Sequence, residues 1–464
     1  MTPDDVAFAS ISALLALLAR REVTSREVTL LLLERIQRYD ARINGYITVM
    51  ADQALADADT ADARRTAGES GIVLGVPIAL KDLCETAGVR TTAGSRILAE
   101  YIPARDATVV TKLRAAGAVV LGKTHMAEFA YGFSHPDYGP SRTPWDTNRS
   151  ANGSSGGSGA VVAAALAYGA VGSDTGGSIR APAAACGITG HKPTYGLVSR
   201  AGVVPLSYSL DHVGPMTRTA ADAMVMLEAM AGTDPRDPSS TTMMRWQAPR
   251  EPLRDLRGLR VGFLVELLEG LELPYRRGVE AAAATVQALG ATVEAVTLPG
   301  LDTVSAILLG IMDPEAGSYH THWLRERPGD YGPIVRRYLL ASHAMPATQY
   351  VDAQRMRARF NRGMSDLFGR YDVLIGPTDT TVARSIDEAE REGVDDWDFR
   401  YTGVSNVTGG PAVALPCGFS DDNLPLSVQV LAPPFEDALA LQVAEAFQMV
   451  TDFHTRRPPD FLAR

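Results

Sequence analysis

Residues 150–199 read SANGSSGGSGAVVAAALAYGAVGSDTGGSIRAPAAACGITGHKPTYGLVS. Two glycine-rich turns in this stretch enclose a run of small apolar residues that predicts a helix at Ser158–Tyr168. Glycines around such a helix let the backbone approach a ligand closely and let amide hydrogens turn toward it. A flexible linker would not enclose an apolar helix and then continue into GSDTGGSIR at residues 172–180. We therefore interpret the stretch as a binding or catalytic turn inside a packed domain.

Helical and strand patterns alternate on both sides of this turn. The run Gly71–Leu80 (GIVLGVPIAL) predicts a buried strand that ends at Lys81, and Thr24 with Glu27 forms a capping-box pattern at the start of a helix. Helices are also expected at residues 25–39, 107–116 and 276–289, and an alanine-rich helix follows the first of these and ends at about residue 65. Strands are expected at residues 118–121, 259–265, 292–296, 371–375 and 411–416. This alternation is typical of an α/β layer structure with a largely buried sheet.

The 464 residues are enough to bury one large core or two ordinary ones. We predict one domain that spans residues 1–464, with N-terminal helices in residues 1–70, a core in residues 71–220 and a variable region in residues 300–400. Residues 232–258 are rich in Pro, Asp and Ser and predict a loop. The acidic stretch Asp387–Asp398 is most simply a solvated loop.

Charge and cysteine usage exclude several classes of protein. A formal net charge of −10 argues against binding to a phosphate backbone, so no nucleic acid partner is expected and a small substrate is favoured. The cysteines Cys84, Cys186 and Cys417 are far apart and lack metal-ligand spacing, which suits a reducing compartment. The acidic N-terminus lacks an export pattern, and Ala160–Val171 is too short to cross a membrane. A cytoplasmic protein with no membrane association is therefore expected.

Three motifs point to chemistry that their context does not support. Gly117–Thr124 (GAVVLGKT) fits the phosphate-loop expression, but its apolar interior predicts a strand rather than an open loop. Gly153–Gly157 (GSSGG) fits the nucleophile elbow with Ser155 at its centre, yet no strand precedes it. On a strand, His320 and His322 could share one side and bind a metal, but no carboxylate or thiol cluster accompanies them, so a surface or core role is favoured.

Four ordered motifs carry a resemblance to a known family. They are GVPIALKD at residues 75–82, GSSGGS at 153–158, GSDTGGSIRAPAAACG at 172–187 and KPTYGLVS at 192–199. In sequence and spacing this set resembles the amidase signature family, most densely over residues 72–217. The resemblance implies an α/β fold whose large, twisted, mixed sheet is covered by helices on both faces. It also implies a hydrolase of carboxamide C–N bonds that works without a cofactor or a metal.

The resemblance assigns three residues to a Ser-cisSer-Lys triad: Ser178 is the nucleophile, Ser154 the bridging serine and Lys81 the base. Their chemistry is consistent with these roles, because a hydroxyl between a serine and an amine can accept one proton and donate another. Lys81 must be neutral to act, and a fall of its pKa from ~10.4 to about 7–8 costs roughly 4 kcal/mol, which burial can supply. The alternative is a surface lysine that pairs with Asp82.

The turn before the nucleophile is expected to form an oxyanion hole. Its donors are the amides of four consecutive residues, Thr175, Gly176, Gly177 and Ser178. The resemblance gives Asp174 and Arg180 the supporting task of ordering this turn. Ser155 is interpreted as structural, and Cys186 as a packed small residue rather than a reactive thiol.

Two related activities and one unrelated function remain open at this stage. The first is a stand-alone amidase, which by the same acyl-enzyme chemistry also suits esters or carbamates, with a pocket built by residues 125–145 and 300–400. The second is the glutamine-hydrolysing A subunit of a tRNA-dependent amidotransferase. Those subunits usually read Lys-Asp-Asn where this chain reads Lys81-Asp82-Leu83, whereas Arg357 lies in a segment similar to their glutamine-binding one. The third is nucleotide binding at Gly117–Thr124, and a homodimer is left open.

Overall fold

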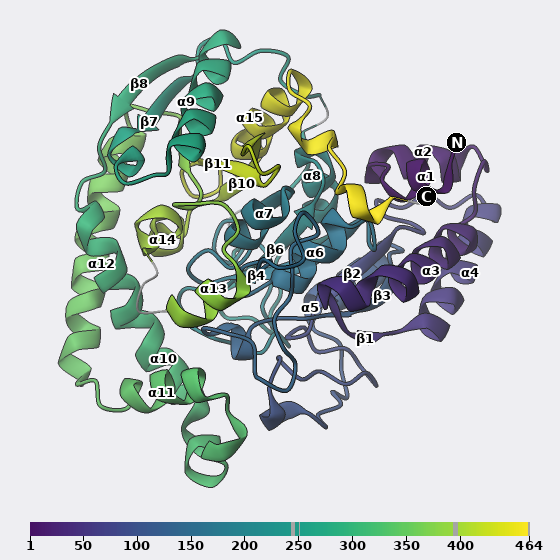
Figure 1. The fold of residues 1–464 in the computed structure, drawn as a ribbon, viewed down its shortest axis with the longest axis horizontal. Coiled ribbons are helices and arrows are strands. Elements are labelled where there is room, and N and C mark those ends of the chain that lie inside the picture. Colours follow the sequence, from purple (N-terminus) through teal and green to yellow (C-terminus); the bar gives the residue numbers. More distant parts are fainter. Residues whose placement is uncertain (243–245, 250, 393–397, 463–464) are drawn as a thin grey trace.

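The computed structural model describes residues 1–242, 246–249, 251–392 and 398–462. Eleven strands of these residues form one sheet in the order β1-β3-β2-β4-β6-β5-β10-β11-β9-β7-β8 (Figure 1). The strands are β1 (Tyr46–Val49), β2 (Pro77–Lys81), β3 (Val119–Thr124), β4 (Gly169–Asp174), β5 (Thr189–Lys192), β6 (His212–Thr217), β7 (Arg260–Leu264), β8 (Thr292–Val296), β9 (Val373–Pro377), β10 (Ala412–Phe419) and β11 (Pro425–Leu431).

Helices cover both faces of this sheet, which confirms the expected α/β class with a mixed sheet. They are α1 (Pro3–Ala7), α2 (Ile11–Ala19), α3 (Ser25–Ile43), α4 (Ala51–Thr66), α5 (Thr108–Ala115), α6 (Gly156–Ala163), α7 (Arg180–Cys186), α8 (Ala220–Met230), α9 (Leu273–Ala288), α10 (Val304–Glu326), α11 (Pro333–Ser342), α12 (Ala347–Phe368), α13 (Ile386–Glu392), α14 (Phe399–Thr408) and α15 (Asp437–Met449). Within the described ranges, no helix is both long and apolar enough to cross a membrane.

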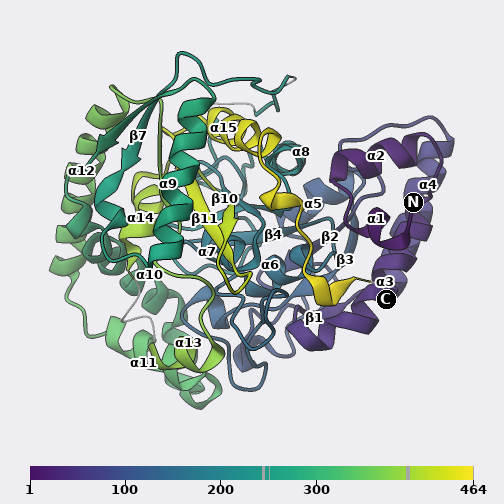
Figure 2. The ribbon, with the colours of Figure 1, turned by 45° about the horizontal axis from the view of Figure 1, so that its top comes forward.

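The two ends of the chain meet on one side of the molecule. Figure 2 shows the N- and C-termini beside α1 and α3, at the side opposite to β7 and α12. The Arg42 guanidinium on α3 pairs with Asp460 at 2.9 Å, and the rings of Tyr39 and Phe461 lie 5.4 Å apart. The C-terminal segment therefore packs onto the N-terminal helices.

Parallel pairing brings the functional segments to one edge of the sheet. β2 pairs in parallel with both β3 and β4, whereas β4 pairs antiparallel with β6. The carboxyl ends of parallel strands meet at the same edge, where open α/β sheets bind ligands. Lys81 ends β2 and Asp174 ends β4, so both lie at this edge beside the turn that leads into α7.

Several local predictions are confirmed. Thr24 and Glu27 form the reciprocal capping box at the start of α3, and α4, α5, α9, β7, β8, β9 and β10 overlap the residues expected for them. The phosphate-loop candidate is the buried strand β3, and Gly117 ends the preceding helical segment with φ +92°. In the part of residues 232–258 that the structure describes, no helix or strand occurs.

Other local predictions are wrong. His320 and His322 lie on α10 rather than on a strand, and residues two apart on a helix do not face each other. The core or surface role favoured for them is confirmed: His320 is buried against the Tyr331 hydroxyl at 2.9 Å, and exposed His322 contacts Glu326 at 3.2 Å. Part of the acidic stretch expected to be a loop forms α13, and residues 393–397 of that stretch lie outside the described residues.

The remaining differences concern boundaries, several strands and helices such as α8, α10, α12 and α15, which the sequence patterns did not predict. The strand expected from Gly71 begins only at Pro77, because Gly75 turns the chain with φ +78°. The helix expected to reach Tyr168 ends at Ala163, since Ala165 is left-handed with φ 52°. The sequence patterns also missed β1, β5, β6 and β11: β1 and β5 have only four residues each, and Gly214 and Pro215 interrupt the apolar pattern of β6.

Candidate active site

Lys81 is the buried base candidate at the end of β2. Its side chain is fully buried, and Nζ donates to the Ser154 hydroxyl at 2.7 Å and to the Ser173 hydroxyl at 2.9 Å. Burial lowers the pKa of Lys81 to about 7, although the nearby Asp174 and Asp211 carboxylates act in the opposite direction. A lysine with this pKa is partly neutral at neutral pH and can accept a proton.

The pairing of Lys81 with Asp82 expected for a surface lysine does not occur. Asp82 is instead buried with Lys123, whose Nζ lies 3.0 Å from Oδ1, and it accepts from the Thr92 amide at 2.8 Å. Lys123 belongs to the GAVVLGKT motif and also donates to the Thr91 hydroxyl at 2.8 Å. The one lysine of that motif is therefore engaged inside the core rather than presented to a phosphate.

Ser154 and Ser155 lie in the loop that leads into α6. The Gly153–Ser154 peptide bond is cis, and both serines are buried. The Ser155 hydroxyl donates to the Ser173 carbonyl at 3.2 Å, and the Ser155 amide donates to the Ser178 carbonyl at 3.2 Å. Ser155 thus joins its loop to β4 and to the following turn.

Ser178 lies in the turn between β4 and α7, at the wall of a cavity of about 110 Å³. Its backbone is joined to the Ser154 loop through the contact with Ser155. Among the described residues, no hydrogen bond links the hydroxyls of Ser178 and Ser154 directly. Catalytic hydrogen bonds are often long before substrate binds, so the missing contact does not exclude Ser178 as the nucleophile. Its role stays a prediction.

The amides of the turn divide into two groups. The Gly177 amide donates to Asp174 Oδ1 at 2.8 Å, and the Ile179 amide donates to Asp174 Oδ2 at 3.1 Å. Of the four donors expected for an oxyanion hole, Gly177 is therefore already engaged, whereas the amides of Thr175, Gly176 and Ser178 donate to no acceptor among the described residues.

The glycines of the turn are required by close packing. A Cβ atom at Gly176 would lie 2.8 Å from the Phe399 ring. Gly177 has φ +128° and faces the Thr402 side chain, whose hydroxyl donates to the Gly176 carbonyl at 2.5 Å. No other residue type fits this backbone without strain. The turn is therefore clamped between β4 and α14.

Asp174 and Arg180 order the turn through a buried ion pair. Arg180 Nη2 donates to Asp174 Oδ1 at 3.0 Å, and Nε donates to Oδ2 at 3.1 Å. Arg180 also donates to the Thr402 carbonyl and to the side chains of Asn406 and Gln429. Burial alone would raise the pKa of Asp174, but the charge and hydrogen bonds of Arg180 hold it well below its usual range. The pair joins β4, α14 and β11.

Two further polar residues of the site were missed by sequence reasoning. Ser173 accepts a hydrogen bond from Lys81, and buried Asp211 accepts from the Thr175 hydroxyl at 2.6 Å and from the amides of Leu206 and Ser207. Ser173 stands inside the quoted glycine-rich turn, so its position was a usable signal. Asp211 lies far along the chain, and only the antiparallel pairing of β4 with β6 brings it to the site.

Arg357 and Cys186 are not part of the wall around Ser178. Arg357 on α12 is half-buried, and its Nε donates to the Val407 carbonyl at 2.8 Å. Cys186 is fully buried, and burial raises the pKa of its thiol to about 12, as expected for a packed residue. In the described residues, no group of three or more His, Cys, Asp or Glu side chains is arranged to hold a metal ion.

Comparisons with known proteins agree on one family. A model of the family described as Amidase matches residues 27–441. The chain is 41% identical to the A subunit of the glutamyl-tRNA(Gln) amidotransferase of Chromohalobacter salexigens, over 97% of this chain and 98% of that protein. It also resembles a chain of a vestigial protein complex that reveals the evolutionary origins of an s-triazine catabolic enzyme, with a TM-score of 0.89, 34% identity and coverage of 95% of this chain and 98% of that chain. The peptide amidase from Stenotrophomonas maltophilia has a TM-score of 0.83 at 30% identity, with 98% of each chain covered.

Proposed function

The chain belongs to the amidase family, and from this premise we propose that it cleaves a carboxamide C–N bond through an acyl-enzyme on Ser178, with Ser154 and Lys81 as the proton relay. The observation that carries the proposal is the buried amine of Lys81, 2.7 Å from the Ser154 hydroxyl. Its lowered pKa supports the role of base.

The proposed reaction has two halves. Neutral Lys81 takes a proton from Ser154 while Ser154 takes one from Ser178, and Ser178 Oγ attacks the carbonyl carbon of the substrate. The amides of Gly176 and Ser178 stabilise the oxyanion, and the C–N bond breaks as the leaving nitrogen receives the proton through Ser154. Water then hydrolyses the acyl ester by the same relay. The same steps would cleave esters or carbamates.

Labelling with a fluorophosphonate tests this proposal. We expect one covalent adduct per chain, mapped by peptide mass spectrometry to Ser178, because an activated serine is the group that such a reagent modifies. The matched control is Ser155→Ala, since Ser155 lies beside Ser154 but is assigned a structural role. The Ser155→Ala variant should be labelled at Ser178 like the wild type. An adduct on Ser155 of the wild type, or loss of labelling in Ser155→Ala, would refute the assignment of the nucleophile.

The relatives bear on whether the chain works alone or as a subunit of an assembly. The Chromohalobacter protein is the A subunit of an amidotransferase, and a 40% identical protein from Moorella thermoacetica has the same name. This similarity supports the second candidate, a glutamine-hydrolysing A subunit that works with partner chains, better than it supports a stand-alone amidase. The departure at Leu83 and the placement of Arg357 outside the cavity wall support the stand-alone form.

Purification from the native cell separates the two settings. For an A subunit, we expect affinity-tagged protein to retain partner chains and the assembly to release ammonia from glutamine. For a stand-alone amidase, the pure chain alone should hydrolyse simple amides and show no activity with glutamine. Ammonia release from glutamine that appears only with copurified chains would decide for the A subunit.

A further inference from the structure

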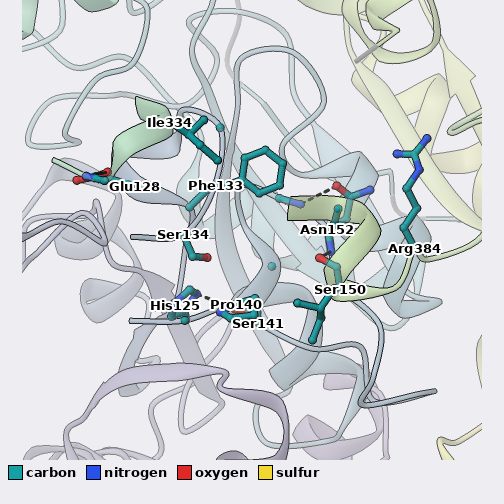
Figure 3. A pocket seen from close by; sticks show the side chains of 18 of the residues that line it. His125, Glu128, Phe133, Ser134, Pro140, Ser141, Ser150, Asn152, Ile334 and Arg384 are labelled. Carbon is teal, nitrogen blue, oxygen red and sulfur yellow. Dashed lines mark hydrogen bonds between the residues drawn. The ribbon is translucent and has the colours of Figure 1, made fainter. Parts of the chain in front are cut away.

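A second and larger cavity lies beside the loop that carries Ser154. Its volume is about 580 Å³, within the range of ~300–1,000 Å³ usual for small-molecule sites. Figure 3 shows Phe133 and Ile334 on one wall, opposite the Ser150–Asn152 segment. Its apolar lining side chains include Phe133, Ile334, Val335, Val382 and Ile386. We call this cavity the apolar chamber.

The walls of the apolar chamber are held in place by a buried carboxyl group. Glu128 accepts from the Gly332 amide at 2.9 Å and from the Ser95 hydroxyl at 2.5 Å. Gly332 immediately precedes α11, which carries Ile334 and Val335. These contacts fix the α11 wall against the segment that carries Phe133, so the apolar chamber is formed before any substrate enters.

The apolar chamber adjoins the cavity at Ser178. Five residues line both cavities: Gly132, Asn152, Gly153, Asp379 and Arg384. Asn152 Nδ2 donates to Asp379 Oδ2 at 3.1 Å, and this pair marks the junction. The two cavities therefore share a wall at Asn152, which is where a substrate held at Ser178 would have to pass to reach the apolar chamber.

The two cavities differ in which part of an amide they can receive. The acyl carbon must lie at Ser178, with its oxygen near the amides of Gly176 and Ser178, so the cavity of about 110 Å³ receives the acyl group. The leaving nitrogen must lie near Ser154, which returns the proton. Asn152 and Gly153, which precede Ser154 in the chain, line both cavities, whereas Gly156, which follows it, lines only the apolar chamber, so this chamber lies on the Ser154 side of the junction.

We propose that the apolar chamber binds an alkyl or aryl group on the leaving amine, so that the preferred substrates are N-substituted amides with a compact acyl group. This inference rests on the proposed amide hydrolysis at Ser178. Glutamine releases ammonia and has no such group, so it would leave the apolar chamber unused. The inference therefore opposes the A-subunit setting and agrees with the stand-alone one.

Two series of amides test the inference, because they separate bulk on the amine from bulk on the acyl group. N-methyl-, N-butyl- and N-hexylacetamide have nearly equal intrinsic reactivity, and we expect kcat/KM to rise about 10-fold or more along the series as apolar area is buried. Acetamide, butyramide and hexanamide should show no such rise. An equal or greater gain in the acyl series would overturn the inference.

Filling the apolar chamber provides the second arm of the test. Val382 is half-buried in its wall, so Val382→Phe should lower the ratio of kcat/KM for N-hexyl- to N-methylacetamide about 10-fold, and hexylamine should inhibit the variant more weakly. The control is Val351→Phe on the exposed face of α12, which should keep the wild-type ratio. An unchanged ratio in Val382→Phe refutes the inference alone. If the wild type hydrolyses no amide and is not labelled by fluorophosphonate, the proposed function fails as well.

Discussion

Replacing Lys81 with methionine should lower kcat/KM for amide hydrolysis, and the rate of fluorophosphonate labelling, by about 10³-fold. General acid–base groups typically contribute 10²–10⁴-fold, and Lys81 is the amine that contacts Ser154. Methionine has a similar length and shape but no proton acceptor of useful basicity. The labelling rate matters because it requires no knowledge of the natural substrate.

The pH profile distinguishes a base from a structural lysine. Because burial lowers the pKa of Lys81 to about 7, the wild-type labelling rate should rise as the pH passes about 7 and level off above it. The residual rate of Lys81→Met should lack this rise. A variant that labels within 10-fold of wild type, or that keeps the rise near pH 7, would contradict the assignment of Lys81.

Thermal unfolding serves as the control for Lys81→Met. In the wild type, the unfolded chain binds a proton at Lys81 up to its ordinary pKa of ~10.4, whereas the folded chain releases it above about 7. The unfolded state thus binds more protons between these limits, so this residue costs stability at neutral pH. Methionine removes that cost, which stabilises the fold, and also removes the hydrogen bonds to Ser154 and Ser173, which destabilises it. Because the two effects oppose each other, Tm should change by only a few degrees.

Replacing Arg180 with methionine should destabilise the fold by about 3–5 kcal/mol, the range measured when one partner of a buried ion pair is removed. Arg180 and Asp174 are fully buried, and the variant would leave the Asp174 carboxylate without its cation. Urea denaturation at pH 7, followed by circular dichroism, measures the change. A loss below 1 kcal/mol would contradict the role assigned to the pair.

The loss of stability in Arg180→Met should depend on the pH and on the presence of the Asp174 carboxylate. Arg180 holds the pKa of Asp174 below its usual range, so the stabilisation is present above the ordinary pKa of ~3.9 and is lost as the pH falls further. Without Arg180, burial raises that pKa, so the deficit of the variant should shrink from pH 7 toward pH 4. In a double-mutant cycle, Asp174→Asn should recover part of the loss, because it removes the unpaired charge.

The type of fold was predictable from the sequence because it depends on local patterns. The buried strand that ends at Lys81 and the capped helix at α3 arise from residues close together in the chain. The predicted strand at GAVVLGKT was also correct, because four apolar residues cannot form an open phosphate loop. The strands β5 (TGHK) and β6 (HVGPMT) were not predictable, because neither contains a continuous or alternating apolar run.

For the candidate site too, one part was determined by the sequence and another only by the tertiary structure. By itself, the sequence determined which residue types stand at Lys81, Ser154 and Ser178, because ordered motifs carry them. Only the tertiary structure decided that Lys81 is buried against two hydroxyls, that Gly177 is engaged by Asp174, and that Asp211 joins the site. It also decided the size of the apolar chamber, whose walls come from segments far apart in the chain. The physical reason is that burial and cavity volume depend on long-range packing, which no local pattern encodes.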